Sequence, residues 1–372
     1  MAIGHVYYPH MLNITRHGIL LEATSEPFEN QAVLNPATLQ EGTVTHLFYR
    51  AVSQGNYSSI GYARLEQGAI VYRSKKPILT YERAYERHGI EDPRIVFLDG
   101  TYYLFYTVFD GTDAQVAYAT AKELPHFTKH GIISPHVSYA ELATVCRKIS
   151  TTKDSFSYLC NHLWLNLAHN GEILLWEKDA FIFPRKVGGK YLLMHRIKPE
   201  IQLLAFDSFD QLRKKYWLDH LAHLESATVL TPMFGFEDFY VGGGAPPIET
   251  SSGWLLIYHA VQWGIKGPIY RGAAALLDIN NPAKVLGRLP YPLLSPEMEY
   301  ERQGDVGNVV FPTGVTLIGD SLTLYYGAAD TRIAYASLSA TKLINELLHH
   351  GANPIPRTSR EAMGLRTHLY GA

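Results

Sequence analysis

The sequence repeats one pattern five times, and this repetition limits the fold more than any other feature. Each copy begins with a polar residue or a glycine that is followed by Pro, Ala or another apolar residue. A turn, an aromatic-rich strand such as HLFYRA and a short apolar strand such as SSIGYARL come next. The copies begin at Asn35, Asp92, Asp179, Gly243 and Asn308, so successive starts are 57, 87, 64 and 65 residues apart.

Turns that contain Gly or Asp separate the strands within each copy, as antiparallel hairpins require. Five antiparallel units of roughly 60 residues predict radial repetition, and therefore an all-β fold of the five-bladed β-propeller type. A β-sandwich would show shorter spacing and no such period. Because each blade buries its faces only against its neighbours, we expect residues 1–372 to form a single domain.

Two segments fall outside the repeat. The long second interval indicates an insertion over about residues 136–175, which could be a lid over the propeller's mouth or a plain surface excursion. Within it, SYAELATVCRKI could be helical. Near the C-terminus, SATKLINELLHH carries Leu and Ile at helical spacing. This predicts a short amphipathic helix and a tail over about residues 339–372. No other convincing helix is visible between the repeats.

Composition narrows the class of partner. A net charge of −2 shows no basic surplus for nucleic acid or an anionic membrane, and no apolar run could span a bilayer. The 17 His and two Cys residues lack metal-ligand spacing, so we expect no metal and no cofactor. The N-terminus lacks a basic region followed by an apolar core. We expect a cytoplasmic protein if the sequence is complete; a secreted form without its signal and a homo-oligomer stay open.

The innermost strands of a propeller begin around a central channel, and ligands bind there. A ring of carboxylates, amides and guanidiniums among aromatic side chains suits a polyhydroxylated, uncharged ligand, which indicates an oligosaccharide. Any one of these residues could instead cap a strand, but convergence from separate blades is harder to explain in that way. The candidate binding residues are Asn35, Arg50, Arg94, Lys178, Asp179, Arg196, Tyr240, His259, Tyr270, Asp305 and Asp330, with Asn308 at the last repeat start.

Five motifs, in the right order, are similar to glycoside hydrolase family 130 over about residues 15 to 345. They are GIEDPRI (89–95), KDAFIFP (178–184), GGGAPPIETSSGWLLIYHAV (242–261), YRGAAALLD (270–278) and LTLYYGAAD (322–330). The resemblance implies a five-bladed propeller that acts on β-mannosides with inversion. Most of the family are phosphorylases, and one branch consists of hydrolases.

The resemblance also implies a proton donor, the aspartate of the EDPR motif, which is Asp92 here. In the family this aspartate reaches the glycosidic oxygen through a hydroxyl group of the mannose. A general acid must be held protonated near neutral pH. Strand alternation should point Glu91 away from Asp92. Arg94 shares the face of Asp92 and could orient it, although a guanidinium would lower the pKa of the acid.

The nucleophile is either phosphate or water. Arg196 and His259 match phosphate-binding positions of the phosphorylases, but Tyr240 stands where a lysine is usual. Trp176 and Glu177 stand where we align an arginine and an amide. Loss of a cation and gain of a carboxylate both disfavour a phosphate dianion.

We therefore expect an inverting hydrolase of β-1,2-mannosides, in which a glutamate activates water. The base would be Glu177 or Glu237, with Glu225 less favoured. The main alternative is a phosphorylase that uses inorganic phosphate as co-substrate and releases α-mannose 1-phosphate. A mannosyltransferase with a nucleotide donor and a non-catalytic mannoside-binding propeller are the remaining alternatives.

Overall fold

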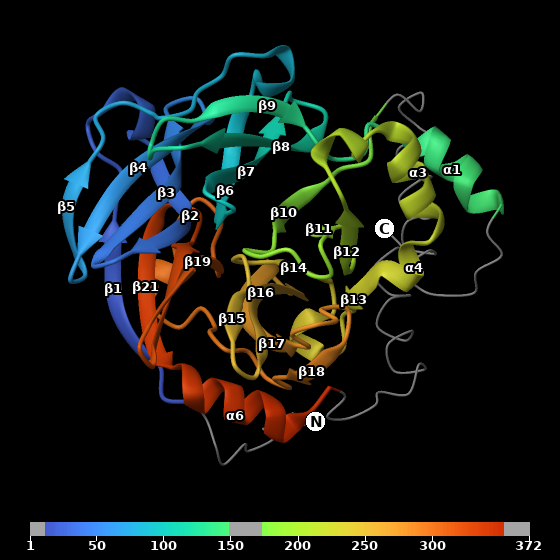
Figure 1. Ribbon diagram of the computed structural model, residues 1–372. Coiled ribbons are helices and arrows are strands. Elements are labelled where there is room, and N and C mark those ends of the chain that lie inside the picture. The colour runs from blue at the N-terminus through green and yellow to red at the C-terminus, as the bar shows by residue number, and fades with distance from the viewer. Residues whose placement is uncertain (1–11, 149–172, 353–372) are drawn as a thin grey trace.

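The computed structural model describes residues 12–148 and 173–352, and in them five antiparallel blades surround one centre, the first two joined by a single parallel pair, Ser58 with Gly89 (Figure 1). From the innermost strand outward, the first blade contains β2 (Ala32–Glu41), β3 (Val44–Ser53), β4 (Tyr57–Glu66) and β5 (Ala69–Arg73), and the second contains β6 (Gly89–Leu98), β7 (Thr101–Phe109), β8 (Ala114–Ala121) and β9 (Thr128–Ile132). The third contains β10 (Lys178–Ile182), β11 (Tyr191–Arg196), β12 (Ile201–Phe206) and β13 (Thr228–Leu230).

In the fourth blade the innermost strand has two segments, β14 (Tyr240–Gly243) and β15 (Ile248–Thr250), and both pair with the same second strand. The blade continues with β16 (Gly253–Gly264), β17 (Gly267–Leu277) and β18 (Val285–Arg288), and the fifth contains β19 (Val310–Ile318), β20 (Ser321–Ala328), β21 (Arg332–Ser339) and β1 (Thr15–Leu21). The strand nearest the N-terminus thus completes the last blade by antiparallel pairing with β21, and this pairing closes the ring (Figure 1).

The polar residue at the start of each repeat has a backbone explanation. Asn35, Asp92, Asp179 and Asn308 all adopt positive φ, between 48° and 60°. Asn and Asp tolerate this left-handed region better than other residues with a side chain. At the first three of these positions the strand register shifts, which is the signature of a β-bulge and re-aims a side chain. The repeat in the sequence therefore marks bulges that turn polar groups toward the centre.

Four blades share a second device, which we call the blade clamp: a buried glutamate paired with a cation on the outermost strand of the same blade. Each glutamate lies in a short helical turn before an inner strand, in η1 (Pro27–Glu29), η2 (Ala84–Glu86), η4 (Gly235–Glu237) or α5 (Glu299–Arg302). The pairs are Glu29–Arg73, Glu86–Lys129, Glu237–Arg288 and Glu301–Arg16, with N–O distances between 2.9 and 3.1 Å. The clamp therefore ties the entry of each of these blades to its outer edge.

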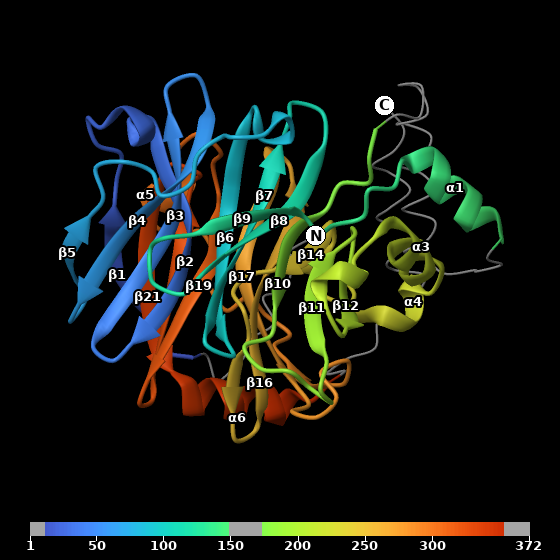
Figure 2. The same ribbon diagram turned by 45° about the horizontal axis from the view of Figure 1, so that its top comes forward.

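The third blade is different, because the turn before β10 has no such glutamate. Between β12 and β13 lie α3 (Lys214–Ala222) and α4 (Leu224–Ala227), and α3 packs beside α1 (Tyr139–Lys148) (Figures 1 and 2). The expectation of no further helix was wrong here. Trp217 and Leu221 lie one helical turn apart and are both buried, a pattern that the sequence carried.

The helix expected within the insertion is present as α1, and the helix near the C-terminus is present as α6 (Ala340–His350). The Ser339 hydroxyl accepts a hydrogen bond from the Lys342 amide and caps α6, whose Leu343 and Leu347 are buried. The lid or excursion of the insertion falls largely on residues 149–172, and the tail on residues 353–372; both lie outside the described residues. The five-bladed fold is confirmed, while the single domain stays a prediction.

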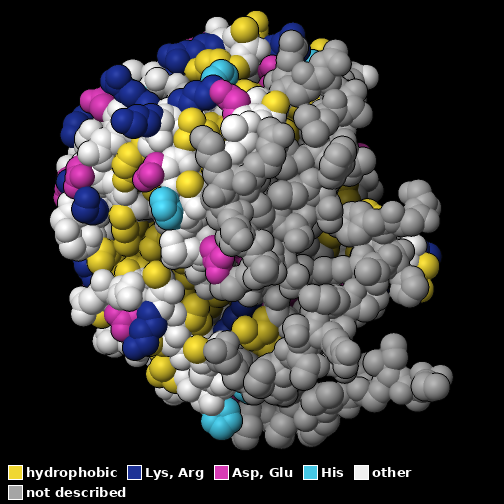
Figure 3. All heavy atoms as spheres, turned by 90° about the vertical axis from the view of Figure 1, so that its right-hand side faces the viewer, with side chains coloured by type: hydrophobic (Ala, Val, Ile, Leu, Met, Phe, Trp, Pro, Cys, Tyr) yellow, Lys and Arg dark blue, Asp and Glu magenta, His cyan; other side chains and the backbone are white. Residues whose placement is uncertain are grey.

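No helix of the described ranges is long and apolar enough to cross a membrane. On the face that carries α1 and α3, basic and acidic side chains of the described residues are interspersed rather than gathered by sign (Figure 3).

Candidate active site

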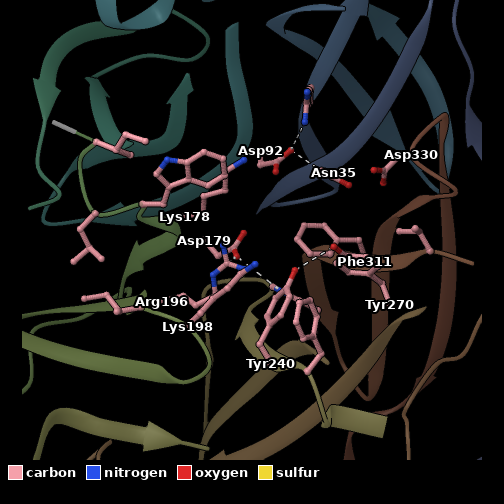
Figure 4. A pocket seen from close by; sticks show the side chains of 18 of the residues that line it. Asn35, Asp92, Lys178, Asp179, Arg196, Lys198, Tyr240, Tyr270, Phe311 and Asp330 are labelled. Carbon is pink, nitrogen blue, oxygen red and sulfur yellow. Dashed lines mark hydrogen bonds and ion pairs between the residues drawn. The ribbon is translucent and has the colours of Figure 1, made fainter. Parts of the chain in front are cut away.

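A cavity of about 540 Å³ lies where the inner strands begin, and all five blades contribute to its wall (Figure 4). This volume is within the usual range for small-ligand pockets. Ten of the predicted site residues meet there besides Asp92: Asn35, Arg50, Lys178, Asp179, Arg196, Tyr240, His259, Tyr270 and Asp330 among the predicted binding residues, and Trp176 of the predicted phosphate-site positions. The rest of the wall consists of Thr112, Tyr139, Ile173, Leu175, Ile197, Lys198, Phe239, Val309 and Phe311.

The predicted acid, Asp92, faces this cavity from the bulge of β6. Asn35 donates a hydrogen bond of 2.8 Å from Nδ2 to the Asp92 Oδ1, and the Arg50 guanidinium lies 3.7 Å from the same oxygen. Arg94 donates from Nη1 to the backbone carbonyl of Asp92 at 3.0 Å. Two side chains of the first blade and the buried guanidinium of Arg94 from the second blade thus fix both the carboxyl group and its backbone.

Glu91 lies outside the wall of the cavity, as strand alternation predicted. Its two carboxylate oxygens bind the Arg50 Nη2 at 3.0 Å and the Lys178 Nζ at 3.1 Å. Burial alone would raise the pKa of Glu91, but the charges of Arg50 and Lys178 outweigh it and lower the pKa to about 2. A permanently ionised Glu91 therefore holds two pocket cations in place.

Asp330 is a second carboxyl group on the side of the cavity that holds Asp92 and Asn35 (Figure 4). Burial and the neighbouring charge of Asp92 raise the pKa of Asp330 to about 6, although Arg50 acts in the opposite direction. Its φ of 50° lies in the left-handed region. Strain and a displaced pKa in one residue of a cavity are typical of a functional position.

Asp179 is surrounded by cations at the bottom of the site. Its carboxylate lies 3.3 Å from the Arg196 Nε and 3.5 Å from the Arg94 Nη2. Burial would raise the pKa of Asp179, but Arg196, His259 and Arg94 overcome this effect and lower the pKa. Asp179 is therefore an ionised support for Arg196 and is poorly placed to take up a proton.

His259 is fully buried beside Asp179, with its Nε2 3.8 Å from the Asp179 Oδ2. Neither ring nitrogen has a hydrogen-bond partner among the described residues. Burial lowers the pKa of His259 to about 3, so the ring is neutral and keeps one N–H to donate. Tyr240 donates to the Tyr270 hydroxyl at 3.1 Å, and burial raises the pKa of Tyr240 well above 10. These three rings contribute neutral donors and aromatic surface.

The sequence analysis missed Lys198, which follows β11 and lines the cavity. Its Nζ lies 4.1 Å from the centre of the Tyr240 ring. A basic residue two positions after Arg196 was a visible signal, and the turn that follows β11 brings it into the cavity wall. The cavity therefore contains one more cation than the sequence analysis counted.

Trp176 forms an aromatic part of the wall and is 47% exposed. Its indole Nε1 donates a hydrogen bond of 3.0 Å to the Thr112 carbonyl, which holds the ring in place. A fixed and accessible aromatic face can stack against a sugar ring. Trp176 therefore suits the sugar rather than an anion.

Glu177 does not face the cavity. It is 1% exposed, and its Oε1 accepts hydrogen bonds from the Arg196 amide at 2.9 Å and from the His195 ring at 3.2 Å. His195 in turn contacts His220 of α3 at 2.9 Å. The interpretation of Glu177 as a base disagrees with this geometry, because its partners hold the carboxylate inside the third blade.

Glu237 belongs to the blade clamp of the fourth blade and is also absent from the cavity wall. Arg288 bonds both of its carboxylate oxygens at 2.9 Å, and the Tyr258 hydroxyl donates to it at 2.7 Å. The amides of Met233 and Phe234 complete its partners. The interpretation of Glu237 as a base disagrees with the geometry too, because every acceptor position is used within the protein.

Three other candidates lie around the cavity rather than in its wall. Arg94 is buried behind it, where its Nε donates to the Gly244 carbonyl. Asp305 is exposed and lines an adjoining cavity of about 310 Å³, which shares Arg50 and Asp330 with the main one. Glu225 is exposed on α4. Arg94 thus supports the site from behind, and the other two have no place in it.

Comparison with known proteins was made on the whole chain. The family profile described as beta-1,4-mannooligosaccharide phosphorylase, that of glycoside hydrolase family 130, matches residues 9–349. A 1,2-beta-oligomannan phosphorylase of Thermoanaerobacter sp. (strain X514) is 33% identical over 331 residues, which are 86% of this chain and 94% of the relative. A beta-1,2-mannobiose phosphorylase of Listeria innocua is 30% identical over 298 residues, 78% of this chain and 69% of the relative.

Solved structures agree in fold. The beta-1,2-mannobiose phosphorylase from Listeria innocua in complex with beta-1,2-mannobiose has a TM-score of 0.67 at 22% identity and covers 90% of this chain and 99% of its own. A structure from a study of family members that hydrolyse beta-1,2 mannosidic linkages in Candida mannan has a TM-score of 0.68 at 20% identity, over 91% of this chain and 96% of its own. The chain belongs to glycoside hydrolase family 130, a family of enzymes that contains mannoside phosphorylases and glycoside hydrolases.

Proposed function

We propose that the enzyme is a phosphorylase that cleaves a β-1,2-mannosidic bond with inorganic phosphate and releases α-mannose 1-phosphate. This reverses the preference for water that the sequence analysis reached. The β-1,2 linkage is carried by the names of the relatives that match most of the chain.

One observation carries the proposal: the cavity has cations and neutral donors where the nucleophile must bind, and the candidate glutamate bases face elsewhere. Lys178, Arg196 and Lys198 line the cavity, whereas Glu177 and Glu237 lie inside their blades. Phosphate needs several cations and N–H donors to offset the loss of its hydration. Water in an inverting glycosidase needs a free carboxylate, roughly 6.5–9.5 Å from the acid.

The two sides of the cavity suit an in-line displacement. Asp92, Asn35 and Asp330 lie along one side, and Arg196, Lys198 and Tyr240 lie across from them (Figure 4). In the proposed step a phosphate oxygen attacks the anomeric carbon as the bond from that carbon to the glycosidic oxygen breaks. The proton of Asp92 passes to the leaving oxygen, through a sugar hydroxyl as in the related enzymes. The products are α-mannose 1-phosphate and an oligosaccharide one mannose shorter.

One observation favours a hydrolase: Tyr240 stands where the resemblance implies a lysine in the phosphorylases. The remaining carboxyl groups in the described wall are Asp179 and Asp330. Asp179 is ion-paired with Arg196, and Asp330 lies on the side of the acid. An inverting water must attack from the opposite face, so neither group is well placed as its base.

The test is to incubate the enzyme with β-1,2-mannobiose with and without millimolar phosphate and to quantify the sugars by anion-exchange chromatography. We expect equal amounts of mannose and α-mannose 1-phosphate when phosphate is present, and almost no turnover without it. Phosphate-free enzyme that releases two mannoses at an unchanged rate would overturn the proposal. The Asp92→Asn enzyme serves as the blank in both arms.

A further inference from the structure

Lys198 is the one pocket lysine for which the described residues offer no acceptor. Lys178 bonds the Glu91 carboxylate at 3.1 Å, whereas no hydrogen bond or ion pair of the Lys198 side chain is found in the described part of the chain. Its ammonium group lies on aromatic faces instead, 4.1 Å from the centre of the Tyr240 ring and 5.6 Å from that of Phe239. An ammonium group that is partly removed from water gains most from a hydrogen-bonding anion.

The charges around Lys198 also favour the binding of an anion beside it. Burial, Arg196 and Lys178 lower the pKa of Lys198 to about 7, and the charge of Asp179 opposes them only in part. Lys198 therefore shares its site with two other cations and gives up its proton more easily than an ordinary lysine. An anion bound among the three would relieve their repulsion and favour the charged form of Lys198.

The position of Lys198 also accounts for the departure at Tyr240. Tyr240 stands where the phosphorylases that the chain resembles usually have a phosphate-binding lysine. The Lys198 ammonium lies directly on the Tyr240 ring, so this part of the cavity still has a positive charge, supplied from the turn that follows β11. The Arg196 guanidinium lies over the same ring, 5.0 Å from its centre. The two cations thus face one region of the cavity.

We propose that Lys198 is a ligand of the co-substrate phosphate, acting beside Arg196, and that it takes up a proton as phosphate binds. The proposal rests on the phosphorylase function proposed above. It assigns to Lys198 the charge that Tyr240 lacks. It also makes the affinity for phosphate depend on pH through one side chain.

The other groups that face Lys198 keep their charge near neutral pH. Burial raises the pKa of Tyr240 and of Tyr270, so both stay protonated. Burial lowers the pKa of His259 to about 3, so it stays neutral. Asp179 stays ionised because the charges of Arg196 and Arg94 overcome the effect of burial and lower its pKa. Arg196 stays charged, and Lys178 is held by Glu91. Phosphate itself also changes its protonation near neutral pH, so only the part of the pH dependence that the wild type shows and Lys198→Arg lacks is assigned to Lys198.

The experiment compares Lys198→Met, Lys198→Arg and the control Lys284→Met, an exposed lysine in the turn between β17 and β18. Loss of a charged ligand typically costs a factor of about 10 to 100 in affinity. We expect the phosphate KM of Lys198→Met to rise by this factor while kcat at saturating phosphate changes little. Lys198→Arg should recover most of the affinity, and Lys284→Met should match the wild type. Thermal unfolding of each variant checks that the fold is intact.

A second readout separates a ligand from a merely structural residue. Between about pH 7 and pH 9 the phosphate KM of the wild type should rise relative to that of Lys198→Arg, because Lys198 loses its proton and an arginine does not, whereas the ionisation of phosphate itself affects both enzymes alike. An unchanged phosphate KM in Lys198→Met, or equal pH profiles in the wild type and Lys198→Arg, would overturn this inference and leave the phosphorylase function intact. A wild-type enzyme that ignores phosphate would overturn both.

Discussion

Two groups of buried acidic residues occupy different places in the blades, and their partners differ. The carboxylates of the blade clamps are at most 1% exposed, and each has a cation from the outer strand of its own blade. The acids of the cavity, Asp92, Asp179 and Asp330, lie on backbone with positive φ and face open space. The clamps have their charges balanced within the protein, and so does Asp179 through Arg196 and Arg94, whereas Asp92 and Asp330 stay available to a ligand.

The third blade brings this difference into one sheet. It lacks a clamp, carries α3 and α4, and supplies Lys178, Arg196 and Lys198 to the cavity. Its buried glutamate, Glu177, binds the Arg196 amide and His195 instead of an outer-strand cation. The blade that departs from the repeat thus supplies three of the four lysine and arginine side chains in the described cavity wall, and Arg50 of the first blade is the fourth. The repeated clamps stabilise the ring, and the blade without a clamp supplies cations to the cavity.

The largest effect should come from Asp92→Asn. The variant keeps the shape of the side chain and tolerates the positive φ, but it has no proton to give. We expect kcat on β-1,2-mannobiose with phosphate to fall at least about 10²-fold, the usual scale for loss of a general acid. The midpoint of thermal unfolding should stay close to that of the wild type. Near-native turnover would show that Asp92 is not the proton donor.

The opposite pattern should follow from Glu237→Gln, which opens a clamp. Arg288 would stay buried without its counter-charge, and breaking a buried pair in this way costs about 3–5 kcal/mol. Urea unfolding should report this loss, while kcat of the folded enzyme should be nearly unchanged. The control is Glu249→Gln, which removes an exposed partner of Arg185 and should cost less than about 1 kcal/mol. A large loss of kcat at normal stability would return Glu237 to the role of base.

The propeller could be predicted because its evidence is local. Each repeat contains its own turn residues and its own alternation of apolar and polar residues, and neither depends on distant contacts. The start residues were readable for the same reason, since Asn and Asp suit the left-handed bulge at Asn35, Asp92, Asp179 and Asn308. The helices α3 and α4 were missed because they interrupt one blade only and the repeat gave no reason to look for them.

The roles of the glutamates could not be predicted in this way. Glu237 meets Arg288, which is 51 residues further along the chain, and Glu177 is turned inward by His195 and the Arg196 amide. Whether a carboxylate faces a cavity or an ion pair depends on such distant partners, which spacing does not show. The wall residues at strand starts were predicted correctly because the strand start itself sets their place.

The smallest expected effect is the change in stability on replacing Asp330, and the sign of this change distinguishes a cavity acid from a clamp carboxylate. Burial and the charge of Asp92 raise the pKa of Asp330 to about 6, so the folded protein binds this proton more tightly than the unfolded chain. The stability contributed by the protonated group is present below the ordinary carboxyl pKa of about 4 and is lost as pH rises to about 6. Above that pH an ionised Asp330 opposes folding.

Asp330→Asn should therefore stabilise the protein at pH 7 by on the order of 1 kcal/mol and have no such effect near pH 4. Thermal unfolding at the two pH values measures this, with Asp99→Asn as the control, because Asp99 is an exposed turn residue with φ of 49°. If Asp330 belongs with the cavity acids, its ionised form lowers the stability of the fold and Asp330→Asn is more stable at pH 7. If Asp330→Asn is less stable at pH 7, the ionised carboxylate stabilises the fold as the clamp glutamates do.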